Sequence, residues 1–126
     1  MKRLIICLVL LASVLVLSFL GAQFVKKVYS EVDGALLTSL ALAQEGDFEG
    51  AKQAAKRAET LYLQYEKPLA AMVNHGFLAD LGRSLAGVAP LAAEDSKEEF
   101  LGQLAEARTD LAHMRNDHSF IYANLF

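Results

Sequence analysis

The sequence predicts an all-α protein, with one N-terminal transmembrane helix followed by a small antiparallel bundle of three to four helices. Three observations carry this prediction. The chain of 126 residues has room for one domain, and it begins with a long uncharged apolar run. The remainder is rich in Ala and Leu, with few β-branched residues, a balance that favours helix over strand. Apolar residues there recur every three or four positions, which is typical of one face of a helix.

The apolar run extends over residues 4–25, where 18 of 22 residues are apolar and none is charged. About 20 helical residues cross the hydrocarbon core of a bilayer. Two basic residues precede the run and two follow it, and such side chains can reach the headgroups from both ends of a span. We therefore predict that residues 1–27 form a membrane anchor and that residues 28–126 form the bundle domain.

A cleaved signal peptide is the alternative interpretation of this segment, because it has the same basic start. The run is longer than the apolar region of a usual signal peptide, which spans about 7–15 residues. Cleavage after Ala22 would also place Leu20 where a small residue is required. The sequence therefore favours an anchor that is retained.

The orientation of the span is not decided by the basic residues. Lys2 and Arg3 on one side balance Lys26 and Lys27 on the other, so the positive-inside rule gives no preference. A short basic N-terminus most simply stays in the cytoplasm. We expect a single-pass protein of the cell membrane with an extracytoplasmic C-terminal domain.

Charge limits the partners of the bundle domain. Residues 28–126 contain 8 Lys and Arg against 15 Asp and Glu, a net charge of −7. An acidic domain repels phosphate backbones, so nucleic acid is excluded as a partner, and close docking onto anionic lipid beyond the basic collar is not expected. The expected partners are the lipid bilayer, through residues 4–25, and an integral-membrane or envelope protein.

Glycine, proline and capping residues divide the bundle domain into helices. Gly46 followed by Asp47 predicts a helix stop and then an N-cap, and Ser96 three residues before Glu99 fits a capping box. One further boundary lies between Pro68 and residue 76; its position stays open, because Pro68 can open a helix or kink one that runs on.

No helix-breaking residue follows the span directly, so we expect the first helix to continue out of the bilayer as a nearly unbroken stalk. Beyond the apolar run at residues 4–25, the apolar residues form four stripes, each of which predicts one buried helix face. The stripes comprise Val32, Leu36, Ser39 and Ala43; Phe48, Ala51, Ala55, Ala58, Tyr62, Tyr65, Leu69 and Met72; Leu78, Leu81, Leu85, Val88 and Ala92; and Phe100, Leu104, Ala107, Leu111, Met114, His118 and Ile121.

Several features together resemble a known family. They are the leading span, the turn at residues 45–51, the segment at residues 62–67, His75 and the ending at residues 122–126. The chain resembles the bacterial family catalogued as domain of unknown function four-three-six-three, whose members are short, N-terminally anchored and all-helical. The turn of the family commonly contains Trp where this chain has Phe48, and its ending commonly contains Ile where this chain has Leu125. The resemblance implies a single-pass protein of spore-forming Gram-positive bacteria and supplies no catalytic residue.

The sequence contains no recognisable catalytic or metal-binding pattern. His113 and His118 are five residues apart, which separates them by roughly 140° around a helix, whereas ligands of one ion on a helix are three or four residues apart. No Ser or Cys nucleophile lies in a known local context. We therefore expect neither an enzyme nor a bound metal or cofactor.

Four residues are candidates for an interaction surface or a pocket. His75 is the best single candidate for function, although a structural role, capping a helix end or bonding to the backbone, is the favoured interpretation of this residue. Tyr62 and Tyr65 fill the bundle or line a small-molecule cleft, and Phe126 ends an apolar C-terminal segment that closes the bundle or meets a partner. The sequence thus predicts a non-enzymatic interaction or scaffolding protein at the cell envelope. The alternative is an extracytoplasmic ligand-sensing bundle.

Overall fold

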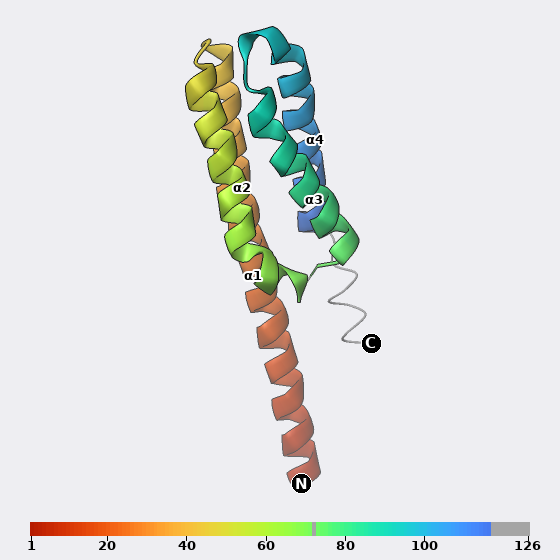
Figure 1. Cartoon of the computed structure of the whole chain (residues 1–126). Coiled ribbons are helices and arrows are strands. Elements are labelled where there is room, and N and C mark those ends of the chain that lie inside the picture. The colour runs from red at the N-terminus through yellow and green to blue at the C-terminus, as the bar shows by residue number, and fades with distance from the viewer. Residues whose placement is uncertain (72, 117–126) are drawn as a thin grey trace.

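The computed structural model describes residues 1–71 and 73–116, which form four α-helices and two short 3-10 turns (Figure 1). No strand occurs in these two ranges, so the predicted all-α fold is confirmed. The elements are α1 (Lys2–Gln44), α2 (Phe48–Ala70), α3 (His75–Val88), η1 (Ala89–Leu91), η2 (Glu94–Ser96) and α4 (Lys97–Asn116).

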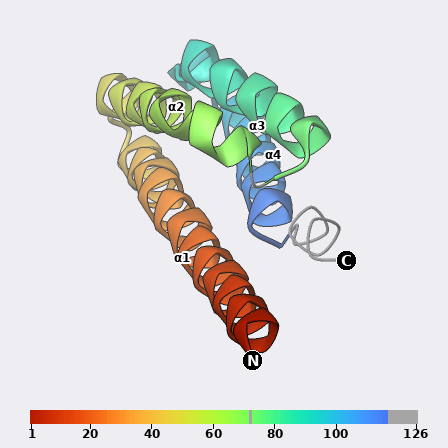
Figure 2. The ribbon, with the colours of Figure 1, turned by 90° about the horizontal axis from the view of Figure 1, so that it is seen from below.

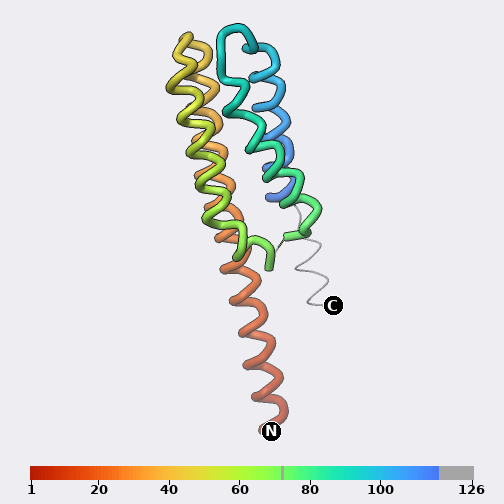
Figure 3. The backbone as a smooth tube through the Cα atoms, viewed as in Figure 1, coloured from red at the N-terminus to blue at the C-terminus, as the bar shows by residue number. Residues whose placement is uncertain are grey.

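The four helices run alternately up and down as two hairpins that lie side by side. Helix α1 packs along α2, α3 packs along α4, and the bundle closes through further contacts between α2 and α3 and between α1 and α4 (Figures 1 and 2). The N-terminal half of α1 projects alone from one end of the bundle. We call this end, which also holds the α2–α3 turn, the proximal end, and we call the opposite end, with the α1–α2 and α3–α4 connections, the distal end (Figure 3).

Helix α1 is continuous over 43 residues, or about 65 Å at 1.5 Å per residue. The segment from Ser30 to Gly34, where a new helix could have started, lies within α1 without a break. A glycine lowers helix propensity without ending a helix, and neighbouring helices cover this part of α1. The predicted continuity of this helix is confirmed.

The turn between α1 and α2 forms as the sequence predicts. Gly46 has a φ of 86°, in the left-handed region that glycine adopts without a steric cost. Asp47 is the N-cap of α2, and its Oδ1 accepts a hydrogen bond from the backbone N–H of Gly50 at 3.0 Å. Helix α4 begins at Lys97, as expected, while the Ser96 hydroxyl donates to the carbonyl of Leu91 at 3.3 Å.

The boundary that the sequence left open lies between Ala70 and His75. Pro68 is in the last turn of α2, where its missing N–H removes one helical hydrogen bond shortly before the helix ends. Asn74 is the N-cap of α3, and its Oδ1 accepts from the backbone N–H of Gly76 at 2.7 Å. His75 is consequently the first residue of α3.

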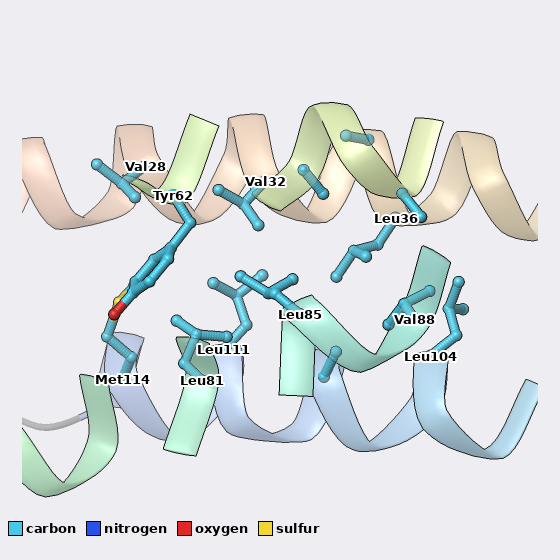
Figure 4. Packing of buried hydrophobic residues seen from close by; sticks show 14 of the residues in the cluster. Val28, Val32, Leu36, Tyr62, Leu81, Leu85, Val88, Leu104, Leu111 and Met114 are labelled. Carbon is cyan, nitrogen blue, oxygen red and sulfur yellow. The ribbon is translucent and has the colours of Figure 1, made fainter. Parts of the chain in front are cut away.

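The predicted stripes form the core, and Figure 4 shows side chains from all four helices meeting there. Buried alanines of α2 let it approach α1 closely, whereas α3 and α4 contribute larger leucines. The buried members of the stripes are Val32, Leu36, Ser39, Ala43, Ala51, Ala55, Ala58, Tyr62, Leu69, Leu78, Leu81, Leu85, Val88, Phe100, Leu104, Ala107, Leu111 and Met114. Met72, His118 and Ile121, which the stripes also include, lie outside the described residues.

Two helical glycines give a matched test of this packing. A Cβ at Gly82 would lie 3.3 Å from Cε1 of Tyr62, whereas a Cβ at Gly102 would meet nothing within 4 Å. We expect Gly102→Ala to raise the free energy of unfolding by about 0.5–1 kcal/mol, because alanine favours the helix. Gly82→Ala should give a clearly smaller gain or a loss. Thermal unfolding of both variants in detergent measures the difference, and equal gains would contradict the packing described here.

Candidate functional site

A surface hollow with a volume of about 520 Å³ lies between α2 and α3. We call it the α2–α3 groove. It is lined by Tyr62, Leu63, Glu66, Lys67, Ala70, His75, Leu78, Ala79, Gly82 and Arg83. Two of the four residues that the sequence proposed for a pocket or an interaction surface, Tyr62 and His75, therefore line the same groove.

Tyr62 forms the inner wall of the groove. Its side chain is 2% exposed and extends from α2 across to α3, where its hydroxyl donates to the carbonyl of Leu78 at 2.7 Å (Figure 4). Gly82 leaves room for the ring, since a Cβ there would crowd it. Burial raises the pKa of Tyr62 to about 12, and the nearby carboxylate of Glu66 contributes to the shift. The Tyr62 hydroxyl is thus a neutral, hydrogen-bonded group that connects α2 to α3.

The outer rim of the groove is more polar. His75 is exposed at the start of α3, and α2 contributes Glu66 and Lys67. Arg83 lies 3.7 Å from Asp80, an exposed ion pair of the kind that adds little stability. The side chain of Leu63 is 56% exposed within this rim. The groove can therefore bind an apolar group in its centre and charged groups at its edge.

Tyr65 does not line the groove. Its ring meets Phe24 of α1 edge to face, with 5.6 Å between centroids, and its hydroxyl donates to Glu31 at 2.8 Å. The hydrogen bond to Glu31 raises the pKa of Tyr65. Residues three apart on a helix diverge by about 60°, and here that difference directs Tyr62 toward α3 and Tyr65 toward α1. The proposed pocket of Tyr62, Tyr65 and His75 does not form as one site.

The fourth candidate, Phe126, lies outside the described residues, as does His118. His113 is exposed, and its ring lies 6.2 Å from that of Phe77, centroid to centroid. Within residues 1–71 and 73–116, no group of three or more His, Cys, Asp or Glu side chains is placed to hold a metal ion.

A second, polar hollow of about 440 Å³ lies between α3 and α4. The buried Ser84 hydroxyl donates to Oδ2 of Asp110, and Nε2 of Gln103 donates to the Ser84 carbonyl at 3.0 Å. These bonds satisfy the polar groups that α3 presents to α4. The sequence did not predict these bonds, because Ser84 and Asp110 are far apart in the chain and apolar periodicity gives no information on polar pairs.

An ion pair connects α1 to α4. Nε of Arg108 donates to Oδ1 of Asp33 at 2.8 Å, and a second guanidinium nitrogen approaches Oδ2 at 3.5 Å. This hydrogen bond raises the pKa of Arg108, and Asp33 is 9% exposed. A carboxylate that is nearly buried needs such a partner, since an unpaired buried charge is costly. The pair fixes the position of α4 along α1.

Comparison with protein-family models, with curated proteins and with solved structures found no match to the chain. The resemblance to domain of unknown function four-three-six-three stays a prediction.

Replacement of Tyr62 by Phe tests its role. At neutral pH, Tyr62→Phe should lower the free energy of unfolding by about 0.5–1.5 kcal/mol, the contribution of a typical hydrogen bond. Above pH 10, unfolded tyrosine loses its proton, whereas folded Tyr62 keeps it to about pH 12. The stability of the native chain should therefore fall as the pH rises through this window.

The variant should show a shallower alkaline decrease, because it lacks this titrating group. Unfolding midpoints measured from neutral to alkaline pH provide the comparison, with Tyr29→Phe as the control. An identical alkaline slope in the native chain and in Tyr62→Phe would show that Tyr62 is not the buried, hydrogen-bonded group described here.

Proposed function

We propose that this chain is a single-pass membrane protein whose bundle acts as a non-enzymatic interaction or scaffolding module at the cell envelope. The uncovered N-terminal half of α1 carries this proposal. Its large apolar side chains between Leu4 and Leu20 are 37–68% exposed. Within the described residues, α1 alone is long and apolar enough to cross a membrane, and only 6% of its most apolar window is buried. A core helix of a water-soluble protein would instead be mostly buried.

Lipid is the covering that suits this surface. Water-soluble monomers rarely expose continuous apolar patches above a few hundred Å², and here the apolar side chains surround the helix on all sides. A helix also satisfies its own backbone hydrogen bonds, which hydrocarbon requires. A cleaved signal peptide has a similar composition. The position considered for cleavage follows Ala22. Gly21 before it and Val25 after it are both buried by the bundle, so the bundle packs against a residue that cleavage would remove, which supports retention of the segment.

The continuity of α1 supports a scaffolding role rather than a loose tether. A flexible linker would let the bundle move freely around its anchor. Here the same helix that leaves the apolar run also contributes Val28, Val32 and Leu36 to the core. The bundle would therefore present its surfaces to a membrane partner at a fixed height and angle.

The α2–α3 groove is the surface that we propose for the partner. The exposed Leu63 supplies an apolar contact in the rim of the groove, beside the charged side chains of Glu66, Lys67 and Arg83. Apolar centres with polar rims are typical of protein interfaces. We further propose that the bundle is extracytoplasmic, because the short basic N-terminus stays inside most simply. The membership in domain of unknown function four-three-six-three remains part of this proposal.

A second candidate function is ligand sensing by the same groove. Its volume of about 520 Å³ and the presence of Tyr62 and His75 in its lining favour this candidate. It stands second, because Tyr65 lies elsewhere and the Tyr62 hydroxyl is bonded to Leu78. A ligand at about 100 times its dissociation constant would stabilise the chain by about 2.7 kcal/mol, which thermal-shift screening detects.

Charged substitutions in the span test the anchor. Replacement of both Leu10 and Leu11 by Arg should move the protein from the membrane fraction to the soluble fraction, because each Arg costs about 2.5–3.5 kcal/mol at the centre of a span. Leu37→Arg is the matched control, since Leu37 is exposed on the part of α1 that belongs to the bundle. It should leave fractionation unchanged. Retention of the double variant in membranes would contradict the anchor.

A cysteine at the groove tests the partner and the orientation together. In a Cys7→Ser background, Leu63→Cys should react with a membrane-impermeant photo-cross-linker added to intact cells, and illumination should give a discrete adduct with a membrane protein. Gln53→Cys, exposed on α2 outside the groove, is the control and should react without forming that adduct.

Each part of the proposal can fail separately in this experiment. Reaction only after the cells are opened would place the bundle in the cytoplasm. Reaction without an adduct, or the same adduct from Gln53→Cys, would contradict a partner at the groove and would leave ligand sensing as the remaining candidate.

A further inference from the structure

The bundle begins inside the apolar run of α1, without a spacer. Residues 4–20 are the uncovered apolar part, and Gly21 and Val25 are buried by the bundle. These 17 residues span about 25 Å, whereas the hydrocarbon core of a bilayer is about 30 Å thick. If the span crosses the membrane, as proposed above, hydrocarbon must reach to about residue 23. The first covered turn of α1 then lies at the boundary between hydrocarbon and headgroups.

The end of α2 extends still further toward the lipid. Tyr65 lies at the level of Phe24, since their rings are in contact. Because α2 runs antiparallel to α1, its five residues from Glu66 to Ala70 continue toward the membrane, over about 7 Å. Figure 3 shows the α2–α3 turn beside the section of α1 where the uncovered part begins. The turn is therefore level with the last residues of the apolar span.

The chemistry of the proximal end suits this position. Pro68 and Ala71 are exposed, and the described residues from Pro68 to Asn74 carry no charge. Three exposed lysines lie on the adjoining parts of the two helices: Lys26 and Lys27 on α1, and Lys67 on α2. Glu66 is the one carboxylate in the last six residues of α2. Aromatic rings are also common at the membrane boundary, where Phe24 and Tyr65 meet.

The distal end has the opposite character. Its two connections carry seven exposed carboxylates and one lysine. They are Glu45, Asp47, Glu49, Glu94, Asp95, Lys97, Glu98 and Glu99. Anionic lipid would repel this end and attract the lysines of the proximal end. The net charge of −7 over residues 28–126 predicted no docking onto anionic lipid beyond the basic collar. That sum excludes Lys26 and Lys27 and does not record where the carboxylates of the domain lie.

We propose that the proximal end of the bundle docks directly onto the membrane and binds the headgroups of anionic phospholipids. The docking surface consists of Lys26, Lys27, Lys67, Pro68 and Ala71. Pro68 and Ala71 lie level with the last residues of the span, at the inner edge of the headgroup layer, and the ammonium groups of the lysines contact lipid phosphates. This inference rests on the proposed membrane anchor. It adds that lipid, rather than water or a flexible stalk, fixes the tilt of the bundle.

Site-directed spin labelling of the full chain tests the docking. Nitroxide labels are placed on native Cys7 and, in a Cys7→Ser background, on Ala71→Cys and Asp95→Cys. The protein is reconstituted in vesicles of phosphatidylcholine and phosphatidylglycerol, and collision with a water-soluble nickel relaxant is measured. The label at Ala71 should collide several-fold less often than the label at Asp95, and the label at Cys7 should be almost inaccessible.

The three labels separate the docking from the anchor. If Cys7 is protected but Ala71 is as accessible as Asp95, the docking is wrong and the anchor stands. If Cys7 itself is accessible, both are wrong.

A charge-matched pair of variants tests the lipid chemistry. In the Ala71→Cys background, replacement of Lys26, Lys27 and Lys67 by Gln should remove the extra protection that phosphatidylglycerol gives over phosphatidylcholine alone. Replacement of three lysines outside the docking surface, Lys52, Lys56 and Lys97, changes the net charge equally and should leave that protection intact. Equal effects of the two triple variants, or no effect of either, would overturn the assignment to anionic headgroups.

Discussion

The structure depends on one constraint: a single helix must satisfy two different surroundings along its length. The first part of α1 exposes apolar side chains on every face, whereas the second part buries one stripe and exposes the rest. No turn separates the two parts, so hydrogen bonds from each turn to the next connect them mechanically. The position of the bundle relative to the apolar segment is thereby set within α1 itself.

Helices α2 and α4 hold to α1 through contacts that differ in kind along its length. Phe24 meets Tyr65 of α2 edge to face, and Arg115 of α4 lies 4.4 Å over the ring of Tyr29. Farther along, Asp33 pairs with Arg108 of α4. Finally, the buried hydroxyl of Ser39 donates to the carbonyl of Ala51 of α2 at 2.7 Å. Each contact has a specific geometry, so the set determines the register of α2 and α4, which alanine packing alone would leave less well defined.

Local patterns in the sequence predicted most of the fold. The spacing of apolar residues identified the buried faces, since a stripe at intervals of three and four can face only one direction on a helix. Asp47 was predictable, because capping needs only the side chain and the next few residues. The boundary near Pro68 was not, because a proline is compatible with the first turn of a helix and with its last, and the capping by Asn74 decides between them.

The candidate site was less predictable, because it depends on contacts between distant residues. Tyr62 and Tyr65 belong to one stripe, yet they face different helices, and periodicity does not resolve that difference. Asp33 and Arg108 are separated by 75 positions, and no local signal pairs them. The net charge of residues 28–126 likewise does not record that exposed carboxylates lie close together at the distal end of the bundle.

Hydrogen–deuterium exchange of the full chain in lipid nanodiscs tests the central claim most directly. If α1 is one helix that passes from lipid into the bundle, amide protection should extend without interruption from residue 4 to Gln44. Fast exchange confined to residues 21–34 would show that the anchor and the bundle are joined by a flexible segment. That result would contradict the account.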